Sequence, residues 1–324
     1  MSRVKWIDIA KGLLILCVII GHTISRESIF FHFIFSFHMP AFFILSGWTA
    51  RHKPNTDLIS SLTRRLLLPY VALALAWNVP QLLINNSSLD LETLSSLFAC
   101  IIFASGTDIV SLGVPAVGMA WFLAALFVCR LLFNTIQGIT NRYQISCAWQ
   151  GVIYLAVSLL GVYCFESNIR LPLSGDVSLC CIFLMWIGSM LSKHRVEALF
   201  LKAPMLVLTP SLWLITALNS NLELAARVLT PPLVAFAASI AGTIFICQAS
   251  LILDRSSWKP VASIGSGLAS IGISSMSLYA IHTVDWFIPW SDFPALAGVN
   301  LSSWFAAVIR CSLDLALVHT VRQQ

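Results

Sequence analysis

Apolar runs of about 17 to 24 residues recur from one end of this 324-residue chain to the other. A helix rises 1.5 Å per residue, so a run of this length can cross the ~30 Å hydrocarbon core of a bilayer. Hydrophobic residues make up 58% of the chain and charged residues only 10%, whereas about 25% of a soluble domain is charged. We therefore expect an all-α polytopic membrane protein.

Ten of these runs predict transmembrane helices. They cover residues 7–24, 29–49, 63–84, 115–134, 149–165, 174–191, 203–219, 229–252, 269–290 and 299–318. The first run has no small-residue cleavage site after it, so it is predicted to be a retained helix and not a signal peptide. A shorter run at 94–104 cannot cross and is predicted to be an interfacial or re-entrant helix.

The basic residues predict which side of the membrane each loop occupies. With ten spans and the N-terminus inside, fifteen Lys and Arg residues fall in cytoplasmic segments, Arg310 among them, and only Arg26, Arg170 and Arg227 fall outside. This asymmetry follows the positive-inside rule and predicts that both termini are cytoplasmic. The net charge of +5 then reflects topology and implies no nucleic-acid partner. No linker interrupts the pattern, so residues 1–324 are predicted to form a single transmembrane domain.

The nine cysteines give no sign of a metal or disulfide framework. None of them forms a CxxC motif, and no Cys/His grouping has the spacing of zinc ligands. Free cysteine packs as a small hydrophobe, so these residues are interpreted as apolar filler. No metal cofactor is expected.

The first apolar run carries the ionisable residues Asp8, Lys11 and His22. On a helix, Lys11 and His22 share one face and lie ~16 Å apart along the axis, and Asp8 pairs with Lys11 at i,i+3. A charged residue within a span costs at least ~2.5 kcal/mol and is a functional-site hypothesis by default. In the alternative interpretation, Lys11 snorkels to the cytoplasmic surface beside Asp8 and His22 lies at the outer interface.

The second and third runs add three further candidates. His38 is predicted near mid-bilayer on the hairpin that carries His22, where a second imidazole suits proton transfer, although a lone histidine is equally often a packing residue. Pro40 frees a backbone carbonyl one turn earlier, which is tolerated only against protein or a wet cavity. Arg64 and Arg65 begin the third run at the cytoplasmic mouth, where they either follow the positive-inside rule or hold phosphates.

Five ordered segments resemble motifs of the acyltransferase family 3 proteins. They read IDIAKGLLILCVIIGH, FHMPAFFILSGW, RRLLLPY, WFLAALF at 121–127 and GISSMSLYAIH at 272–282. The family comprises polytopic bacterial inner-membrane enzymes that O-acylate extracytoplasmic glycans, and this chain most resembles the branch described as fucose 4-O-acetylase-like. The resemblance covers essentially the whole chain, and the first two segments are its most specific motifs.

The resemblance implies a role for several residues. His22 matches the family's catalytic histidine, and Lys11 matches its basic companion, a position where arginine is common. An ammonium cannot form the guanidinium fork, so a bidentate contact is not expected from Lys11. Arg64 and Arg65 match the arginines that receive the nucleotide end of the acyl-CoA. The implied donor is acetyl-CoA, and the implied acceptor is a glycan or lipid-linked sugar.

Acyl transfer to a hydroxyl needs a base and a group that stabilises the oxyanion. We expect His22 to deprotonate the sugar hydroxyl, with Asp8 keeping Lys11 charged beside the donor channel. His38 is expected to donate to the oxyanion or to relay protons, and transient acylation of His22 is a second route. Three further residues are expected to shape the acceptor pocket or, alternatively, to anchor the interface: Trp121, Tyr279 and His282.

A second class of function is also consistent with buried ionisable residues. A ten-helix bundle that carries them could be a proton-coupled transporter or a flippase of a lipid-linked sugar. Such a protein would need neither an Arg64/Arg65 phosphate mouth nor the ordered motifs, so these features favour the acyltransferase.

Overall fold

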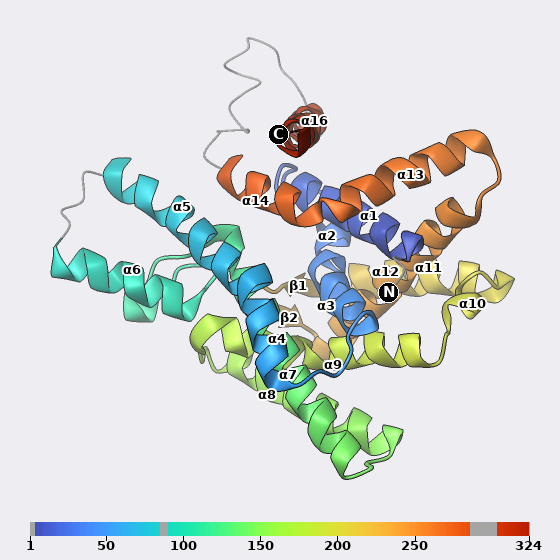
Figure 1. Ribbon diagram of the computed structural model, residues 1–324, viewed down its shortest axis with the longest axis horizontal. Helices are drawn as coiled ribbons and strands as arrows, with labels where there is room; N and C mark the ends of the chain where they lie inside the picture. The colour runs from blue at the N-terminus through green and yellow to red at the C-terminus, as the bar shows by residue number, and fades with distance from the viewer. Residues whose placement is uncertain (1–3, 85–89, 286–302, 324) are drawn as a thin grey trace. The chain divides into compact units, whose positions relative to one another are not determined.

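The computed structural model describes residues 4–84, 90–285 and 303–323, and helices account for most of them (Figure 1). The chain divides into two compact units. Unit 1 consists of Met1–Leu45, Leu191–Leu222 and Thr230–Gln324, and unit 2 consists of Ser46–Met190 and Glu223–Leu229. The single domain expected over 1–324 stays a prediction.

Unit 1 is built around α1, which packs against α12, α13, α14 and α16. A further layer forms where α11 packs on α12 and contacts α2. The helices of this unit are α1 (Lys5–Gly21), α2 (Ile29–Phe35), α3 (His38–Trp48, which continues into unit 2), α10 (Glu197–Phe200), α11 (Ala203–Leu218), α12 (Pro232–Arg255), α13 (Lys259–Ile273), α14 (Ser275–Asp285) and α16 (Ser303–Gln323).

The break between α2 and α3 is held by hydrogen bonds from other helices. Pro40 has no N–H to donate to the carbonyl of Ser36, one turn earlier. That carbonyl instead accepts a 3.1 Å hydrogen bond from Ser239 Oγ on α12, while Ser36 Oγ accepts a 2.9 Å bond from Trp213 Nε1 on α11. Of the two surroundings predicted for the freed carbonyl, protein or a wet cavity, the structure shows protein.

Glycines allow α1 and α13 to cross with their backbones in contact. Gly12 lies against the carbonyl of Leu268, and Gly272 lies against the carbonyl of Asp8. At neither position is there room for a Cβ atom, because the nearest neighbour is backbone and not a movable side-chain end. Small residues permit this kind of close helix packing in membranes.

Replacing Gly272 with alanine is therefore expected to lower stability by about 1 to 3 kcal/mol, the usual cost of overpacking. Gly267 supplies the matched control, because it lies on the same helix and has no atom within 4 Å of its Cβ position. Thermal unfolding of the two alanine variants in detergent measures the difference. Equal midpoints for both variants would contradict the close crossing of α1 and α13.

Unit 2 contains a long helix that runs without interruption from Asn55 to Ile84. It comprises α4 (Asn55–Leu62), the π-helical turn η1 (Thr63–Leu67) and α5 (Leu68–Ile84). The other elements are α6 (Leu91–Phe103), the short turns η2 (Val110–Leu112), η3 (Gly118–Ala120) and η4 (Pro172–Ser174), and the helices α7 (Trp121–Arg142), α8 (Cys147–Glu166) and α9 (Gly175–Lys193). Two short strands, β1 (Asn221–Glu223) and β2 (Val228–Thr230), pair as a hairpin that the sequence analysis did not anticipate.

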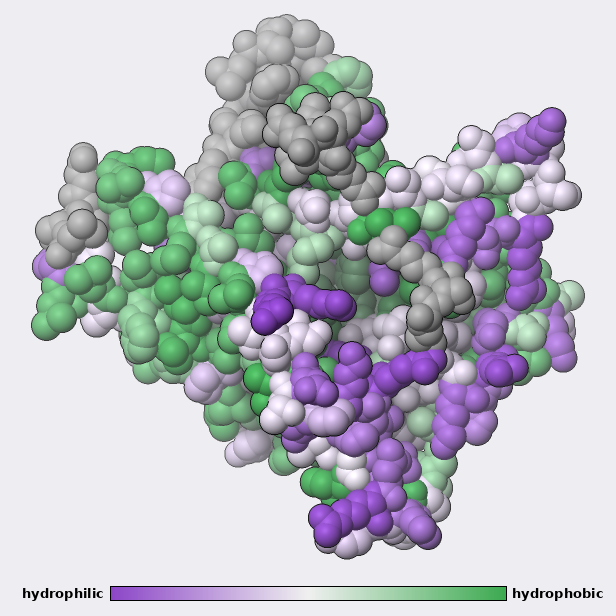
Figure 2. Space-filling view, viewed as in Figure 1, coloured by the Kyte–Doolittle hydropathy of each residue, from purple (hydrophilic) through white to green (hydrophobic). Residues whose placement is uncertain are grey.

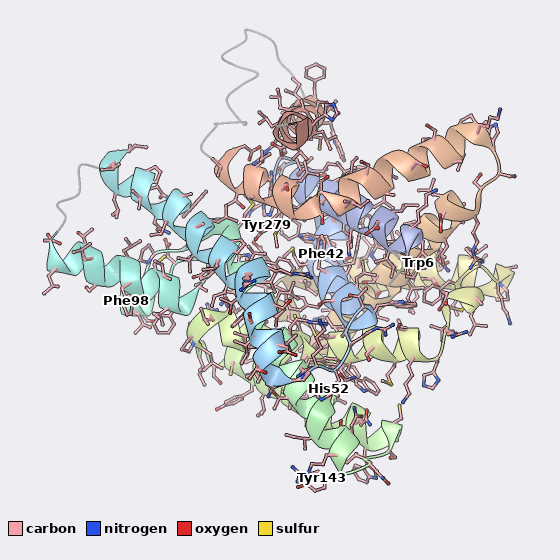
Figure 3. All side chains as sticks on the ribbon, in the orientation of Figure 1. Trp6, Phe42, His52, Phe98, Tyr143 and Tyr279 are labelled. Carbon is pink, nitrogen blue, oxygen red and sulfur yellow. The ribbon has the colours of Figure 1, made fainter. Side chains whose placement is uncertain are left out.

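Hydrophobic side chains cover the outer surface of α5 and α6. Figure 2 shows them gathered over these two helices, and Figure 3 labels Phe98 among them. The exposed members include Leu75, Val79, Leu83 and Phe98, of which Phe98 is 68% exposed. An apolar surface of this extent is typical of a face that contacts another apolar medium, here the hydrocarbon of the membrane.

The all-α polytopic membrane fold is confirmed. Six helices among the described residues are long and apolar enough to cross a bilayer: Ile29–Trp48, Asn55–Ile84, Gly118–Arg142, Cys147–Glu166, Pro172–Lys193 and Pro232–Arg255. Each coincides with one of the predicted runs. The short run at 94–104 forms the 13-residue helix α6, and the run at 203–219 forms the 16-residue helix α11. The count of ten and the cytoplasmic termini stay predictions.

The predicted run at 269–290 is not one straight helix. α13 ends at Ile273, α14 begins at Ser275, and the two axes differ by 68°. The helical segment also begins earlier than predicted, at Lys259, while residues 286–302 lie outside the described ranges. The bend matters because it places α14 against both α1 and α16.

Candidate functional site

His22 directly follows the last residue of α1, where the helix ends and the chain turns toward α2. Its side chain is partly exposed, and two aromatic rings lie near it. The ring of Phe35 meets the His22 ring edge-on at 5.8 Å between centroids, and the ring of His282 on α14 lies 5.7 Å away. The ring of the predicted base therefore packs between the rings of Phe35 and His282.

His38 is buried at the start of α3 and belongs to the same neighbourhood. Its ring lies 4.7 Å from the ring of Phe35, which thus contacts both His22 and His38. Nδ1 of His38 lies 2.9 Å from the carbonyl oxygen of Ile34. A carbonyl can only accept, so Nδ1 carries the hydrogen and Nε2 of the neutral ring is an acceptor.

His282 lies between two aspartates from different helices. Its Nδ1 atom is 3.5 Å from Asp285 Oδ1 on α14 and 3.6 Å from Asp314 Oδ2 on α16. Arg310, also on α16, donates to both carboxylate oxygens of Asp285, from Nε at 2.7 Å and from Nη2 at 2.5 Å. This group of four, His282, Asp285, Arg310 and Asp314, is called the α14/α16 cluster below.

Sequence reasoning missed three of the four members of the α14/α16 cluster. Arg310 was counted among the basic residues of the cytoplasmic segments, and its side chain is in fact 1% exposed and bonded to Asp285 inside the protein; the side of the membrane stays a prediction. The sequence did contain a pattern that indicates these residues. Asp285 follows His282 at i,i+3, and Asp314 follows Arg310 at i,i+4, within otherwise apolar stretches. Ionisable residues at such spacing line one helix face.

The residues predicted to shape an acceptor pocket do not form one set. Tyr279 and His282 share α14 (Figure 3 labels Tyr279), and both are buried. His282 has no exposed surface, which excludes the alternative role of an interfacial anchor. Trp121 begins α7 in unit 2, where it is 5% exposed and packs beside Gly106.

The predicted basic residues occupy two different places. Lys11 Nζ on α1 lies 3.8 Å from Asp8 Oδ1, which is the expected i,i+3 pair. The Lys11 side chain remains partly exposed, whereas Asp8 is largely buried. Arg64 and Arg65 are exposed on η1, the π-helical turn in unit 2.

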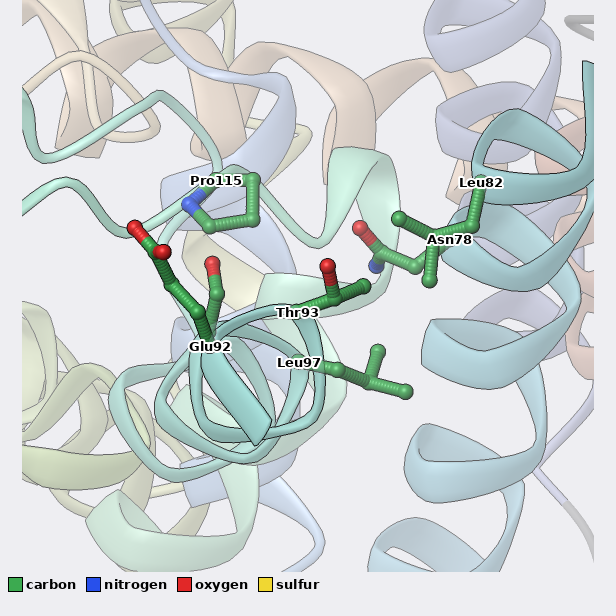
Figure 4. A pocket seen from close by; sticks show the side chains of 7 residues that line it. Asn78, Leu82, Glu92, Thr93, Leu97 and Pro115 are labelled. Carbon is green, nitrogen blue, oxygen red and sulfur yellow. The ribbon is translucent and has the colours of Figure 1, made fainter. Parts of the chain in front are cut away.

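Unit 2 also contains a pocket of about 250 Å³ between α5 and α6. Figure 4 shows Thr93 and Leu97 of α6 extending toward Asn78 and Leu82 of α5, with Glu92 and Pro115 on the other side of the pocket. None of the predicted site residues lines this pocket. The acid–base groups of the chain instead gather around His22 in unit 1.

The arrangement around His22 suits proton transfer. The imidazole of His22 lies beside that of His282, which is flanked by two carboxylates, so groups that accept and donate protons adjoin one another. A base oriented by an acid–base partner is the arrangement that activates hydroxyl groups in many enzymes.

One comparison with known proteins gives a match. A family model described as an acyltransferase domain matches residues 4–313. The matched range includes the whole of α1, the α14/α16 cluster apart from Asp314, and all of unit 2. No curated protein and no solved structure matches the chain.

Proposed function

Because the chain belongs to acyltransferase family 3 and is thus a membrane acyltransferase, we propose that it moves an acetyl or similar acyl group from cytoplasmic acetyl-CoA to a glycan hydroxyl. The acceptor is an extracytoplasmic or lipid-linked sugar, and the membrane is the bacterial inner membrane. The observation that supports this most is His22, a partly exposed imidazole with acid–base groups behind it.

His22 acts as the general base in this proposal. It removes the proton of the acceptor hydroxyl, whose oxygen forms a bond to the thioester carbonyl carbon. The tetrahedral intermediate then collapses, the carbon–sulfur bond breaks, and the thiolate of CoA leaves and takes up a proton. Acylation of His22 itself is the second route, in which the imidazole nitrogen attacks the thioester first.

The geometry of His38 favours one of its two expected roles. A neutral His38 already donates its Nδ1 hydrogen to the carbonyl of Ile34, so its remaining nitrogen cannot donate to an oxyanion. Proton relay, in which Nε2 accepts a proton, is compatible with this bond. We therefore assign His38 to relay.

The acyl donor enters from the cytoplasm. Arg64 and Arg65, exposed in unit 2, bind the phosphates of acetyl-CoA. In unit 1, Lys11, held by Asp8, lies on the helix that ends at His22 and contacts the pantetheine arm. The ~16 Å between Lys11 and His22 along the helix axis is then part of the distance that the arm spans. Tyr279, on the same helix as His282, shapes the acceptor side within unit 1.

The test is acetyl transfer in membrane vesicles. Vesicles that contain the chain receive radiolabelled acetyl-CoA, and label is counted in the glycan fraction. An acyltransferase places label on glycan only in vesicles with the chain, and the purified protein binds CoA. A transporter or flippase moves the unmodified sugar across the bilayer, transfers no label and binds no CoA, and this result would contradict the proposal.

Alanine at both Arg64 and Arg65 is expected to raise the KM for acetyl-CoA roughly tenfold while kcat changes less. Charge-assisted bonds to phosphate act mainly on donor binding, which is far from the reacting atoms. Initial rates at varied acetyl-CoA concentration separate the two constants. Arg142→Ala, another exposed arginine of unit 2, is the control and is expected to leave the KM unchanged.

A further inference from the structure

The α14/α16 cluster is fully enclosed by protein. The exposed fractions are 0% for His282, 8% for Asp285, 1% for Arg310 and 1% for Asp314. Moving a charge from water into such surroundings costs several kcal/mol unless an opposite charge and hydrogen bonds compensate for it. Each charge of the cluster therefore needs an opposite charge or hydrogen bonds that offset the cost of its burial.

One of the two carboxylates is fully compensated. The guanidinium of Arg310 binds both oxygens of Asp285 in the bidentate geometry that is strongest for this pair. Arg310 Nη1 also donates to Thr23 Oγ1 at 3.2 Å and contacts the carbonyl oxygen of His22 at 3.5 Å. The ion pair thus ties α14 and α16 to the turn that carries His22.

The second carboxylate lacks a matching positive charge among the described residues. Asp314 Oδ2 has no hydrogen-bond partner there, and neither has either ring nitrogen of His282. The 3.6 Å between Asp314 Oδ2 and His282 Nδ1 is too long for a good hydrogen bond. With a neutral imidazole, two carboxylates face one guanidinium, and the cluster has a net charge of −1.

The reaction itself supplies the missing positive charge. His22 becomes positive when it accepts the hydroxyl proton, and its ring lies 5.7 Å from the ring of His282. A fixed negative charge behind the base costs energy before the reaction and stabilises the imidazolium as it forms. This is electrostatic preorganisation, the kind of stabilisation that an aspartate gives the histidine of a catalytic triad.

We propose that Asp314, acting through His282, is the positioning carboxylate that stabilises protonated His22 during acyl transfer. The catalytic part of this inference rests on the proposed function. The electrostatic coupling between Asp314 and His22 exists whether or not an acyl donor is present, so it can be measured separately. Asp285 takes no part, since Arg310 already neutralises it.

A protonated His282 would balance the cluster without His22, and the thermal midpoint of Asp314→Asn tests for it, because removing a carboxylate that is paired with an imidazolium lowers stability. A divalent cation is a further way to supply positive charge. Donor atoms of His282, Asp285 and Asp314 lie within 4.8 Å of one another, a spacing that a metal ion can bridge. The charge count favours the proton, because a divalent ion would change the cluster from −1 to +1 directly beside Arg310. Metal binding is therefore an outcome that the test has to distinguish.

The charged and titratable groups around His22 come from the turn after α1 and from three helices. They are Arg26 in the turn after α1, His38 on α3, His282 and Asp285 on α14, and Arg310 and Asp314 on α16. Arg26 is exposed, so water screens its charge. Among the buried members of this set, only Asp314 can be neutralised without breaking the ion pair between Arg310 and Asp285 or changing an imidazole.

The first experiment measures the protonation of His22 without acyl donor or acceptor. Diethyl pyrocarbonate modifies neutral imidazole, and mass spectrometry of the purified protein follows the modification of His22 against pH. In Asp314→Asn we expect the midpoint to move down by about one pH unit, because protonated His22 loses its nearby negative charge. Asp314→Glu keeps the charge and is expected to keep the midpoint, and His194, an exposed histidine, is the internal control.

The second experiment separates positioning from structural support. Asp314→Asn removes an uncompensated buried charge, so we expect its thermal midpoint to equal or exceed that of wild type, while kcat falls at least tenfold and KM does not change. A lower thermal midpoint with an unchanged His22 titration would show a structural role and overturn the proposal. A bound metal, present in wild type and lost in Asp314→Asn by elemental analysis, would overturn it as well.

The proposed function and this inference fail in different ways. If glycan labelling does not depend on His22 but the His22 midpoint still moves in Asp314→Asn, the coupling is real and the assigned chemistry is wrong. If labelling depends on His22 and neither the midpoint nor kcat responds to Asp314→Asn, the inference is wrong and the function stands.

Discussion

Replacing His22 with alanine is expected to reduce acetyl transfer to glycan by 10²- to 10⁴-fold, the usual contribution of a general base. Neither His38 nor His282, the two imidazoles of its neighbourhood, is expected to substitute for it. His38 is buried and uses Nδ1 for the carbonyl of Ile34, and His282 has no exposed surface from which to reach an acceptor. Transfer rates in vesicles with equal amounts of each protein measure the effect.

The controls distinguish chemistry from folding. His194→Ala removes an exposed histidine of the same unit and is expected to leave the rate unchanged. His22→Gln keeps a polar side chain of similar size without a base, and it is expected to be as inactive as alanine while unfolding at the wild-type temperature. A glutamine variant with near wild-type rate would show that His22 only packs.

The sequence was sufficient to predict the elements that depend on local composition. Length and hydropathy predicted six of the helices that are long enough to cross, and the i,i+3 pairing of Asp8 with Lys11 followed from helix geometry. The freed carbonyl of Ser36 was predictable from Pro40 for the same reason. These features need only the neighbouring residues of the chain.

The features that the sequence did not predict depend on contacts between distant segments. Asp285 and Asp314 come together only because the chain bends between α13 and α14, so that α14 packs against α16. Hydropathy averaged over a long run does not reveal that bend. Arg310 was misplaced because counting charges cannot distinguish a solvated arginine from one that is paired in the interior. Long-range pairing therefore set the limit of the prediction.

A second buried ion pair, in unit 2, shows what a purely structural cluster looks like. Asp176, at the start of α9, is fully buried and accepts a 2.8 Å bond from Nε of Arg227 in the β1–β2 hairpin. Arg227 also donates to Ser174 Oγ, Ser105 Oγ and the carbonyl of Ala225. The carboxylate of Asp176 thus faces the guanidinium of Arg227 and, at 4.0 Å, that of Arg170, so its negative charge is balanced, in contrast to that of Asp314 beside a neutral His282.

Arg227→Ala is accordingly expected to lower the stability of the protein by about 3 to 5 kcal/mol, because it removes the hydrogen-bonded counter-charge of Asp176 and leaves only the more distant Arg170 beside the buried carboxylate. Arg170 is the matched control, since it lies 4.0 Å from the same carboxylate but is less deeply buried, and Arg170→Ala is expected to cost much less. Thermal unfolding in detergent compares the two.

The double variant Asp176→Asn/Arg227→Met tests the cause of that loss. If the cost comes from the orphaned charge, removing both charges restores much of the stability, and the two substitutions are strongly non-additive. If the double variant is as unstable as the sum of the single ones, packing of the hairpin and not charge is what Arg227 supplies. The same pair of measurements at Asp314 should give the opposite pattern, because there a single neutralising substitution removes a charge that the folded protein does not balance.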